Sequence, residues 1–195
     1  MKKYLILFFL LGFLHNAFSK NIVVTQKVSE PYIGNISRDC VRKMSYKLIE
    51  VINHLKYFEV KKKNNVVARF DPVGIDRNSL YIWAELSPNG KMLLFNSSDQ
   101  GVFVCNLKGE ILYKIGRDVH AVSWWNNKYI VGMIDEDDGM NFTKSELVMI
   151  KINTGERIPI ITEEAIAVYP CANKPYVEYF TQDNIKYTIK LKIKN

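Results

Sequence analysis

The pattern that most constrains this chain is an alternation of apolar and polar residues, broken by turn residues every eight to twelve positions from about residue 80 onward. Its clearest stretch is 185–194, where isoleucine, leucine and tyrosine alternate with lysine and threonine. A period of two places successive side chains on opposite faces of a β-strand, so the chain is predicted to be all-β. Lysines along one face of this last strand would discourage pairing with other chains at a sheet edge.

Turn residues divide the rest of this region into further strands. In 87–90 (Ser-Pro-Asn-Gly), proline fixes φ at the second position, and asparagine and glycine tolerate the backbone that follows. Similar turns are predicted at 108–109, 126–127 and 154–155. The predicted strands are 91–95, 101–107, 110–115, 121–125, 128–134, 147–152, 156–161 and 185–194.

The predicted strands also repeat as units. Residues 84–94 align with 121–131 at an offset of 37, residues 109–110 align with 155–156 at an offset of 46, and a third unit begins at 167. Four-stranded units that recur at about 40–45 residues are typical of β-propeller blades. The chain has room for about three to four blades, as a small closed ring or an open partial propeller. An open arc would expose sheet edges and apolar faces, which favours self-association.

The N-terminal third is less clearly patterned. Apolar residues at helical spacing are compatible with a helix over about 38–53. The competing interpretation, favoured from residue 46 onward by abundant Val, Ile and Tyr, is three strands at 46–52, 55–60 and 66–70. We therefore expect a propeller-like domain over 46–195, preceded by a segment of uncertain structure over 20–45.

The chain begins with features of a cleavable signal peptide. Lys2 and Lys3 precede an apolar run over 4–14, which is too short to cross a bilayer as a helix. Ala17 and Ser19 then supply the small residues that a signal peptidase recognises, so cleavage is predicted after Ser19. No cysteine follows the run as a lipid attachment point, and no later segment is apolar enough to span a membrane. The product is predicted to be exported, periplasmic or extracellular, and soluble.

Charge and cysteine content limit the partners and the covalent chemistry. After cleavage the formal charge is about +5, because loss of Lys2 and Lys3 from the 27 basic residues of the full chain leaves 25, against 20 acidic residues. The lysines are scattered rather than gathered on one face with aromatic residues, so no nucleic-acid partner is expected. Cys40, Cys105 and Cys171 allow at most one disulfide. Cys105 and Cys171 lie in apolar segments, which favours buried free thiols.

Residues 81–91 resemble the Ser-Pro-Asp-Gly-Lys blade signature of TolB-like propellers, with Asn89 in place of the aspartate. Three segments further resemble exported, uncharacterised propeller proteins of Bacteroidetes. The resemblance covers about 46–195 and implies a fold and a compartment, but no activity. TolB-like propellers close six blades, so this chain looks like a shortened relative. The three segments are 81–95, 124–139 and 165–170.

The sharpest local feature is an acidic run that ends in Gly139. Several carboxylates beside a glycine could bind Ca²⁺, which prefers six to eight oxygen ligands, and Ca²⁺ is the only cofactor considered. The spacing does not match an EF-hand loop, and the alternative is a solvated loop between two strands. The candidate ligands are Asp135, Glu136, Asp137 and Asp138.

No set of residues points to catalysis. The chain has no Gly-x-Ser-x-Gly motif, and His54 and His120 lie near no serine or cysteine in a recognisable arrangement. We therefore expect no enzyme activity. Aromatic residues at strand starts could line a sugar-binding face, although packing between blades is the favoured interpretation. The candidate binding residues are Trp83, Trp124 and Trp125.

These features together predict an exported, non-catalytic binding module of the cell envelope. Its partner would be another envelope protein or a second copy of the chain. One alternative is a propeller that binds carbohydrate or another small ligand. A second alternative is a shortened paralogue without independent function.

Overall fold

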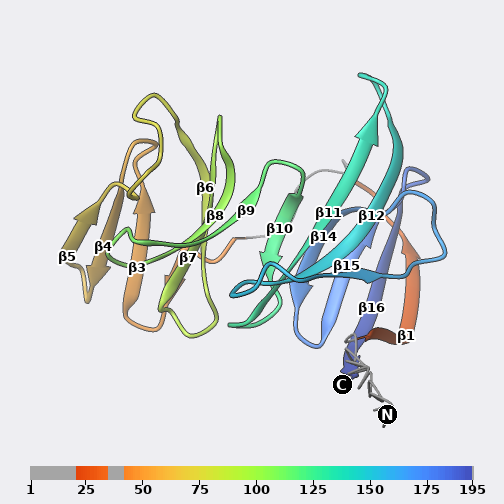
Figure 1. The fold of residues 1–195 in the computed structure, drawn as a ribbon. Helices are drawn as coiled ribbons and strands as arrows, with labels where there is room; N and C mark the ends of the chain where they lie inside the picture. Colours follow the sequence, from red (N-terminus) through yellow and green to blue (C-terminus); the bar gives the residue numbers. More distant parts are fainter. Residues whose placement is uncertain (1–20, 35–41, 195) are drawn as a thin grey trace, which may run out of the picture.

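The computed structural model describes residues 21–34 and 42–194, which form sixteen strands and no helix. The strands make four antiparallel sheets of four strands each (Figure 1). This arrangement confirms the predicted all-β, propeller-like fold built from four-stranded units. The predicted signal peptide over 1–19 and Cys40 lie outside the described residues.

The first and second sheets follow chain order from the inner to the outer strand. The first sheet contains β2 (Ser45–Tyr46), β3 (Ile49–Asn53), β4 (Phe58–Lys62) and β5 (Asn65–Phe70). The second sheet contains β6 (Tyr81–Leu86), β7 (Met92–Ser97), β8 (Gly101–Asn106) and β9 (Ile111–Gly116).

The third sheet also follows chain order, whereas the fourth takes its outer strand from the N-terminus. The third sheet contains β10 (His120–Trp124), β11 (Tyr129–Asp137), β12 (Phe142–Lys151) and β13 (Arg157–Ile160). The fourth sheet contains β14 (Val168–Asn173), β15 (Tyr176–Phe180), β16 (Ile185–Lys194) and β1 (Asn21–Pro31).

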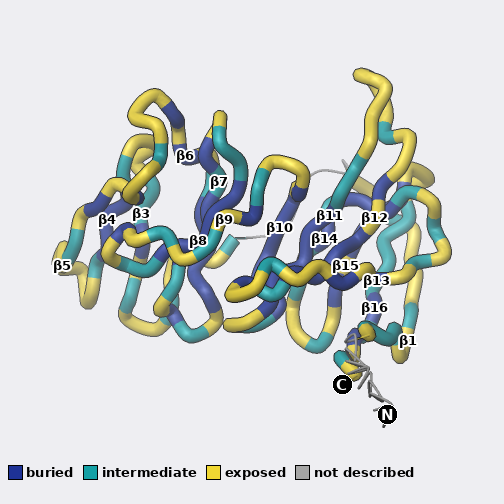
Figure 2. Tube along the Cα trace, in the orientation of Figure 1, coloured by how far each residue is buried: buried dark blue, intermediate teal, exposed yellow. Residues whose placement is uncertain are grey.

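Three hydrophobic cores hold the sheets together, one between each successive pair. Phe58 and Phe95 belong to the core between the first and second sheets, Leu94 and Ile130 to the next, and Met149 with residues of the fourth sheet to the last. Figure 2 shows the buried positions gathered in the strands and the exposed positions at the turns. Among the described residues no core joins the first sheet to the fourth, so the sheets form an open arc.

The C-terminal strand does not lie at an edge. β16 pairs with β15 on one side and with β1 on the other, from Asn21 opposite Lys194 to Pro31 opposite Ile185. The expectation that its lysines protect an edge is therefore wrong. The lysines instead line the outward face of the fourth sheet, because Ile189 and Leu191, which alternate with them, are buried in the core.

The outward face of the first sheet is also charged. Glu59 on β4 accepts a hydrogen bond from Arg69 on β5 at 2.9 Å and lies 3.7 Å from Lys61. Glu50 lies opposite Lys61 in the β3–β4 pair. Polar outer faces are what the end units of stacked repeats need for solubility. The expectation that an open arc would expose apolar faces at its ends is confirmed only in part, because these faces are mainly charged but still expose Val66, Val28 and Tyr176.

In the N-terminal third, the structure contradicts one of the two interpretations of the sequence and agrees with the other. Residues 45–53 form β2 and β3, so the helix over 38–53 is wrong for this part, and residues 38–41 lie outside the described residues. The three-strand interpretation is confirmed, with shifted boundaries. Lys63 and Asn64 both adopt positive φ in the tight turn that joins β4 to β5. The segment without a predicted structure contains β1, which pairs with β16 in the fourth sheet.

The cysteines also differ from expectation in part. Cys105 is a buried free thiol, as predicted, but Cys171 is disulfide-bonded. The apolar surroundings of Cys171 therefore misled the prediction, because apolar context also suits a half-cystine. Burial raises the pKa of the Cys105 thiol to about 12, which keeps it in the unreactive protonated form.

Thiol labelling tests this assignment. The chain has three cysteines, so non-reduced protein should release one reactive thiol per chain in denaturant and essentially none when native. Reduction before denaturation should raise the count from one thiol to all three. Iodoacetamide labelling followed by intact-mass measurement gives these numbers. Rapid labelling of native protein would contradict the burial of Cys105.

Candidate functional site

A pocket of about 640 Å³ lies where the inner strands and turns of the second, third and fourth sheets meet, and we call it the central pocket. Its wall is apolar and its rim is charged. This volume falls within the range of about 300–1,000 Å³ that is usual for ligand pockets. The residues around it are Lys43, Glu85, Leu86, Pro88, Trp124, Trp125, Asn126, Cys171, Ala172, Asn173, Lys174 and Glu178.

The most unusual group in the central pocket is the carboxylate of Glu85 on β6. Glu85 is only 8% exposed. Its Oε1 accepts a long hydrogen bond of 3.4 Å from the Trp124 backbone N–H, and its Oε2 accepts one of 3.3 Å from Arg42. Burial raises the pKa of Glu85 to about 7, although Arg42 and the Trp124 N–H act in the opposite direction. Burial has the largest effect on this pKa, because two long hydrogen bonds replace little of the hydration that the carboxylate loses.

Arg42 ties the segment before β2 to the second and third sheets. Its Nη1 donates to the backbone carbonyl of Val122 on β10 at 2.6 Å. Its guanidinium carbon lies 3.6 Å from the centre of the Trp83 ring, in a cation–π contact. Next to it, the Lys43 carbonyl accepts a hydrogen bond from the Leu86 N–H at 2.7 Å. These contacts fix Lys43 at the rim of the central pocket.

The three candidate tryptophans lie around this region, but not as an exposed sugar platform. Trp124 and Trp125 both line the central pocket and are 3% and 6% exposed. Their rings belong to the cores on opposite faces of the third sheet, as adjacent residues of a strand end require. Trp83 is half-buried beneath Arg42. Sugar binding through these rings remains a prediction, and their burial fits the packing role that the sequence favours.

The rim combines charges of both signs. Lys174 lies in the β14–β15 turn with its ammonium 5.1 Å from the centre of the Trp125 ring. Glu178 on β15 is exposed and lines the same pocket. Sequence reasoning missed Glu85 and these rim residues. The repeat alignment contains one sign that Glu85 is unusual, because the second unit has the apolar residue Val122 at the aligned position.

The acidic run lies elsewhere, in the hairpin formed by β11 and β12. Asp137 Oδ1 accepts the Gly139 N–H at 2.8 Å, and Asp138 Oδ1 accepts the N–H groups of Met140 and Asn141 at 2.9 and 2.8 Å. These carboxylates therefore stabilise the turn. Within the described chain, no three His, Cys, Asp or Glu residues are grouped to hold a metal ion. Calcium binding by Asp135, Glu136, Asp137 and Asp138 remains a prediction without geometric support.

The two histidines of the described chain lie apart from the central pocket. His54 stacks on Tyr57 with ring centres 4.5 Å apart, and His120 is exposed at the start of β10. The pocket thus offers charged and apolar contacts to a ligand, rather than an imidazole base. In the part of the chain that the structure describes, no helix is long and apolar enough to span a membrane.

Together, the four sheets define an open β-propeller-like protein, and the inner strands and turns of three of them form the central pocket. No protein-family model and no curated protein sequence matches the chain. Among solved structures, the chain is similar to the crystal structure of TolB from Acinetobacter baumannii, with 15% identity and a TM-score of 0.37. The match covers 75% of this chain and 41% of that one, so the chain spans less than half of that structure.

Proposed function

We propose that this chain is an exported, non-catalytic binding module of the cell envelope, and that its central pocket receives a segment of another envelope protein. The observation that carries this proposal is the pocket itself. Three sheets contribute its apolar wall, and Lys43, Lys174 and Glu178 surround it with both signs of charge. An apolar centre with a polar rim is the usual anatomy of a protein-binding surface.

Two features support export within this proposal. The N-terminal run over 4–14 has the length and flanks of a signal peptide. Cys171 forms a disulfide, and disulfides persist in oxidising compartments such as the periplasm or the extracellular space. Membership of an exported, TolB-like family that also occurs in Bacteroidetes is part of the same hypothesis.

Charge reversal at the rim tests the proposal. The double variant Lys43→Glu with Lys174→Glu should reduce recovery of a stoichiometric partner from envelope extract by about tenfold. The reason is that the glutamates would repel the groups of the partner that the lysines attract. The matched control is Lys114→Glu with Lys190→Glu, since these lysines also lie over aromatic rings but outside the pocket. The control should retain the partner.

Two results would count against this function. The first is that no partner is recovered, and the second is that both double variants lose it equally. The competing hypothesis of a shortened paralogue without independent function predicts an aggregating protein. A cooperative melt of a monomer would contradict that competing hypothesis.

A further inference from the structure

The hairpin of β11 and β12 extends beyond the rest of the third sheet. β10 pairs with β11 only as far as Met133, and β13 pairs with β12 only as far as Leu147. The β11–β12 pairing continues to Asp137 opposite Phe142. We call this two-stranded extension, residues 134–146, the ribbon. It projects at the top right of Figure 1, and its tip is exposed in Figure 2.

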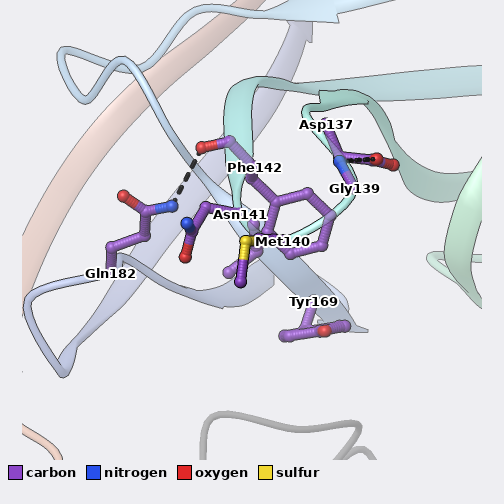
Figure 3. Close-up of a pocket in the computed structure, with 8 residues that line it drawn as sticks. Asp137, Gly139, Met140, Asn141, Phe142, Tyr169 and Gln182 are labelled. Atoms are coloured by element: carbon purple, nitrogen blue, oxygen red, sulfur yellow. Dashed lines mark hydrogen bonds between the residues drawn. The ribbon is translucent and has the colours of Figure 1, made fainter.

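A second pocket, of about 650 Å³, lies between the ribbon and the fourth sheet, and we call it the ribbon pocket (Figure 3). The ribbon contributes one wall, and β14 and the β15–β16 turn contribute the other. None of the central-pocket residues lines it. The residues around it are Asp137, Gly139, Met140, Asn141, Phe142, Val168, Tyr169 and Gln182.

The ribbon is held in place over this pocket. Gln182 Nε2 donates to the Phe142 carbonyl at 2.9 Å, which is the dashed line between these two residues in Figure 3. At the base of the ribbon, Ser145 Oγ donates to the Ala167 carbonyl at 2.6 Å. These bonds join the ribbon to the fourth sheet at two points. A ligand would therefore meet a largely preformed site, which reduces the entropy cost of binding.

Two aromatic rings, together with Met140 and Val168, form the apolar part of the ribbon pocket. Phe142 and Tyr169 meet edge to face, with ring centres 6.1 Å apart. Tyr169 has a φ of 53° in a strand bulge, and Ala121 has a φ of 45° in the corresponding bulge of β10. The bulge with a positive φ thus recurs in the first strand of both the third and the fourth sheet. What the fourth sheet adds at this position is an aromatic ring that faces the ribbon.

The polar part of the ribbon pocket consists of two amides and one carboxylate. Among the described residues, the side-chain amide of Asn141 makes no hydrogen bond, and the Gln182 amide uses only its nitrogen. Asp137 uses one carboxylate oxygen for the turn. Amides and carboxylates offer planar pairs of donors and acceptors to neighbouring hydroxyl groups. No lysine, arginine or histidine lines this pocket, so it does not suit an anion such as a nucleotide.

We propose that the ribbon pocket binds a neutral glycan. A sugar ring presents an apolar C–H face, which suits the aromatic rings of Phe142 and Tyr169, and hydroxyl groups, which suit Asn141, Gln182 and Asp137. A basic peptide fits less well, because the single carboxylate in the wall is partly engaged in the turn. The site is independent of the central pocket and of the protein partner proposed there.

The test begins with purified protein on an array of neutral, sialylated and sulfated oligosaccharides, with a lysine-rich decapeptide measured in parallel. A neutral oligosaccharide should bind, and calorimetry with that soluble oligosaccharide should give a saturable isotherm. Asn141→Ala and Gln182→Ala should each weaken its binding by about five- to tenfold, because each removes a hydrogen bond of about 1 kcal/mol. Both side chains are exposed, so both variants should fold. Tyr169→Phe, which keeps the ring, should retain more binding than Tyr169→Ala.

The control is Tyr176→Ala, because Tyr176 is an exposed aromatic residue on the outward face of the fourth sheet, away from the ribbon pocket. It should leave glycan binding unchanged. The proposal is overturned if no neutral oligosaccharide binds, if only anionic oligosaccharides or the basic peptide bind, or if the Asn141 and Gln182 variants bind as tightly as the original protein. Reversing Lys43 and Lys174 should not affect the isotherm, so failure here is distinct from failure at the central pocket.

Discussion

Replacing Gly101 with alanine should lower the free energy of unfolding by about 3–4 kcal/mol. Gly101 begins β8 with a φ of 88°, a conformation that L-residues with a Cβ rarely adopt. A Cβ built there would lie 2.2 Å from the Gly116 carbonyl oxygen and 2.9 Å from the Arg117 Cα. Both contacts are with backbone, so relief requires that the end of β9 move away from β8. Urea denaturation followed by tryptophan fluorescence measures the loss.

Gly74→Ala separates the two causes of that loss. Gly74 has nearly the same φ, 84°, but a Cβ there would meet nothing within 4 Å. It should therefore show only the cost of the left-handed backbone, about 1 kcal/mol. The difference between the two variants measures the steric conflict with β9. Equal losses for Gly74→Ala and Gly101→Ala would show that the close approach of β8 and β9 is not as described.

The all-β class and the repeated units were predictable because strands and tight turns are encoded locally. The open arrangement of the sheets is indicated less directly, by how apolar residues are distributed along the strands. Strands of the second and third sheets, such as 92–95 and 147–150, are continuously apolar because both faces of these sheets are packed. In the fourth sheet, an end sheet, β16 alternates over 185–194, because one face of this sheet meets water. The strict alternation of the C-terminal strand therefore indicates that one face of its sheet is unpartnered.

The two interpretations of residues 38–53, a helix or strands from residue 46, show what local pattern cannot decide. Short apolar runs fit either period, and here the pairing of β3 with β4 decided the structure. For the acidic run the sequence leaves a calcium site and a solvated loop as alternatives, whereas the structure pairs Asp135 and Glu136 with Ser145 and Lys144 in the ribbon. Its exposure resulted from extension beyond the sheet, which depends on where the neighbouring strands end. No single segment encodes that information.

The two pockets were even less accessible to sequence reasoning, because each is assembled across sheets. Glu85 and Lys174 come together at the central pocket although 89 positions separate them in the chain. Phe142 and Tyr169 lie on different sheets and meet only because the ribbon leans over β14. The tryptophans are conspicuous in the sequence by residue type, whereas the weakly satisfied carboxylate of Glu85 is not. Such groups become visible only once burial is known.

Glu85→Gln should change how stability depends on pH. The pKa of Glu85 is raised by burial to about 7 in the folded protein, against an ordinary value of 4.5. The folded state therefore holds its proton more tightly than the unfolded state. The resulting stabilisation is fully present below about pH 4.5 and is lost as the pH rises through about 7. The loss amounts to about 3 kcal/mol, since one pKa unit corresponds to about 1.4 kcal/mol.

Glutamine has no proton to lose, so the variant should not share this decline. Its unfolding free energy relative to that of the original protein should increase by about 3 kcal/mol between pH 4.5 and pH 8, while all other titrating groups cancel in the difference. Glu178→Gln is the matched control, because Glu178 lines the same pocket but is exposed. Urea titrations at several pH values give both difference curves. A flat curve for Glu85→Gln would mean that Arg42 compensates the buried charge fully, and that the central pocket presents an ordinary carboxylate to its ligand.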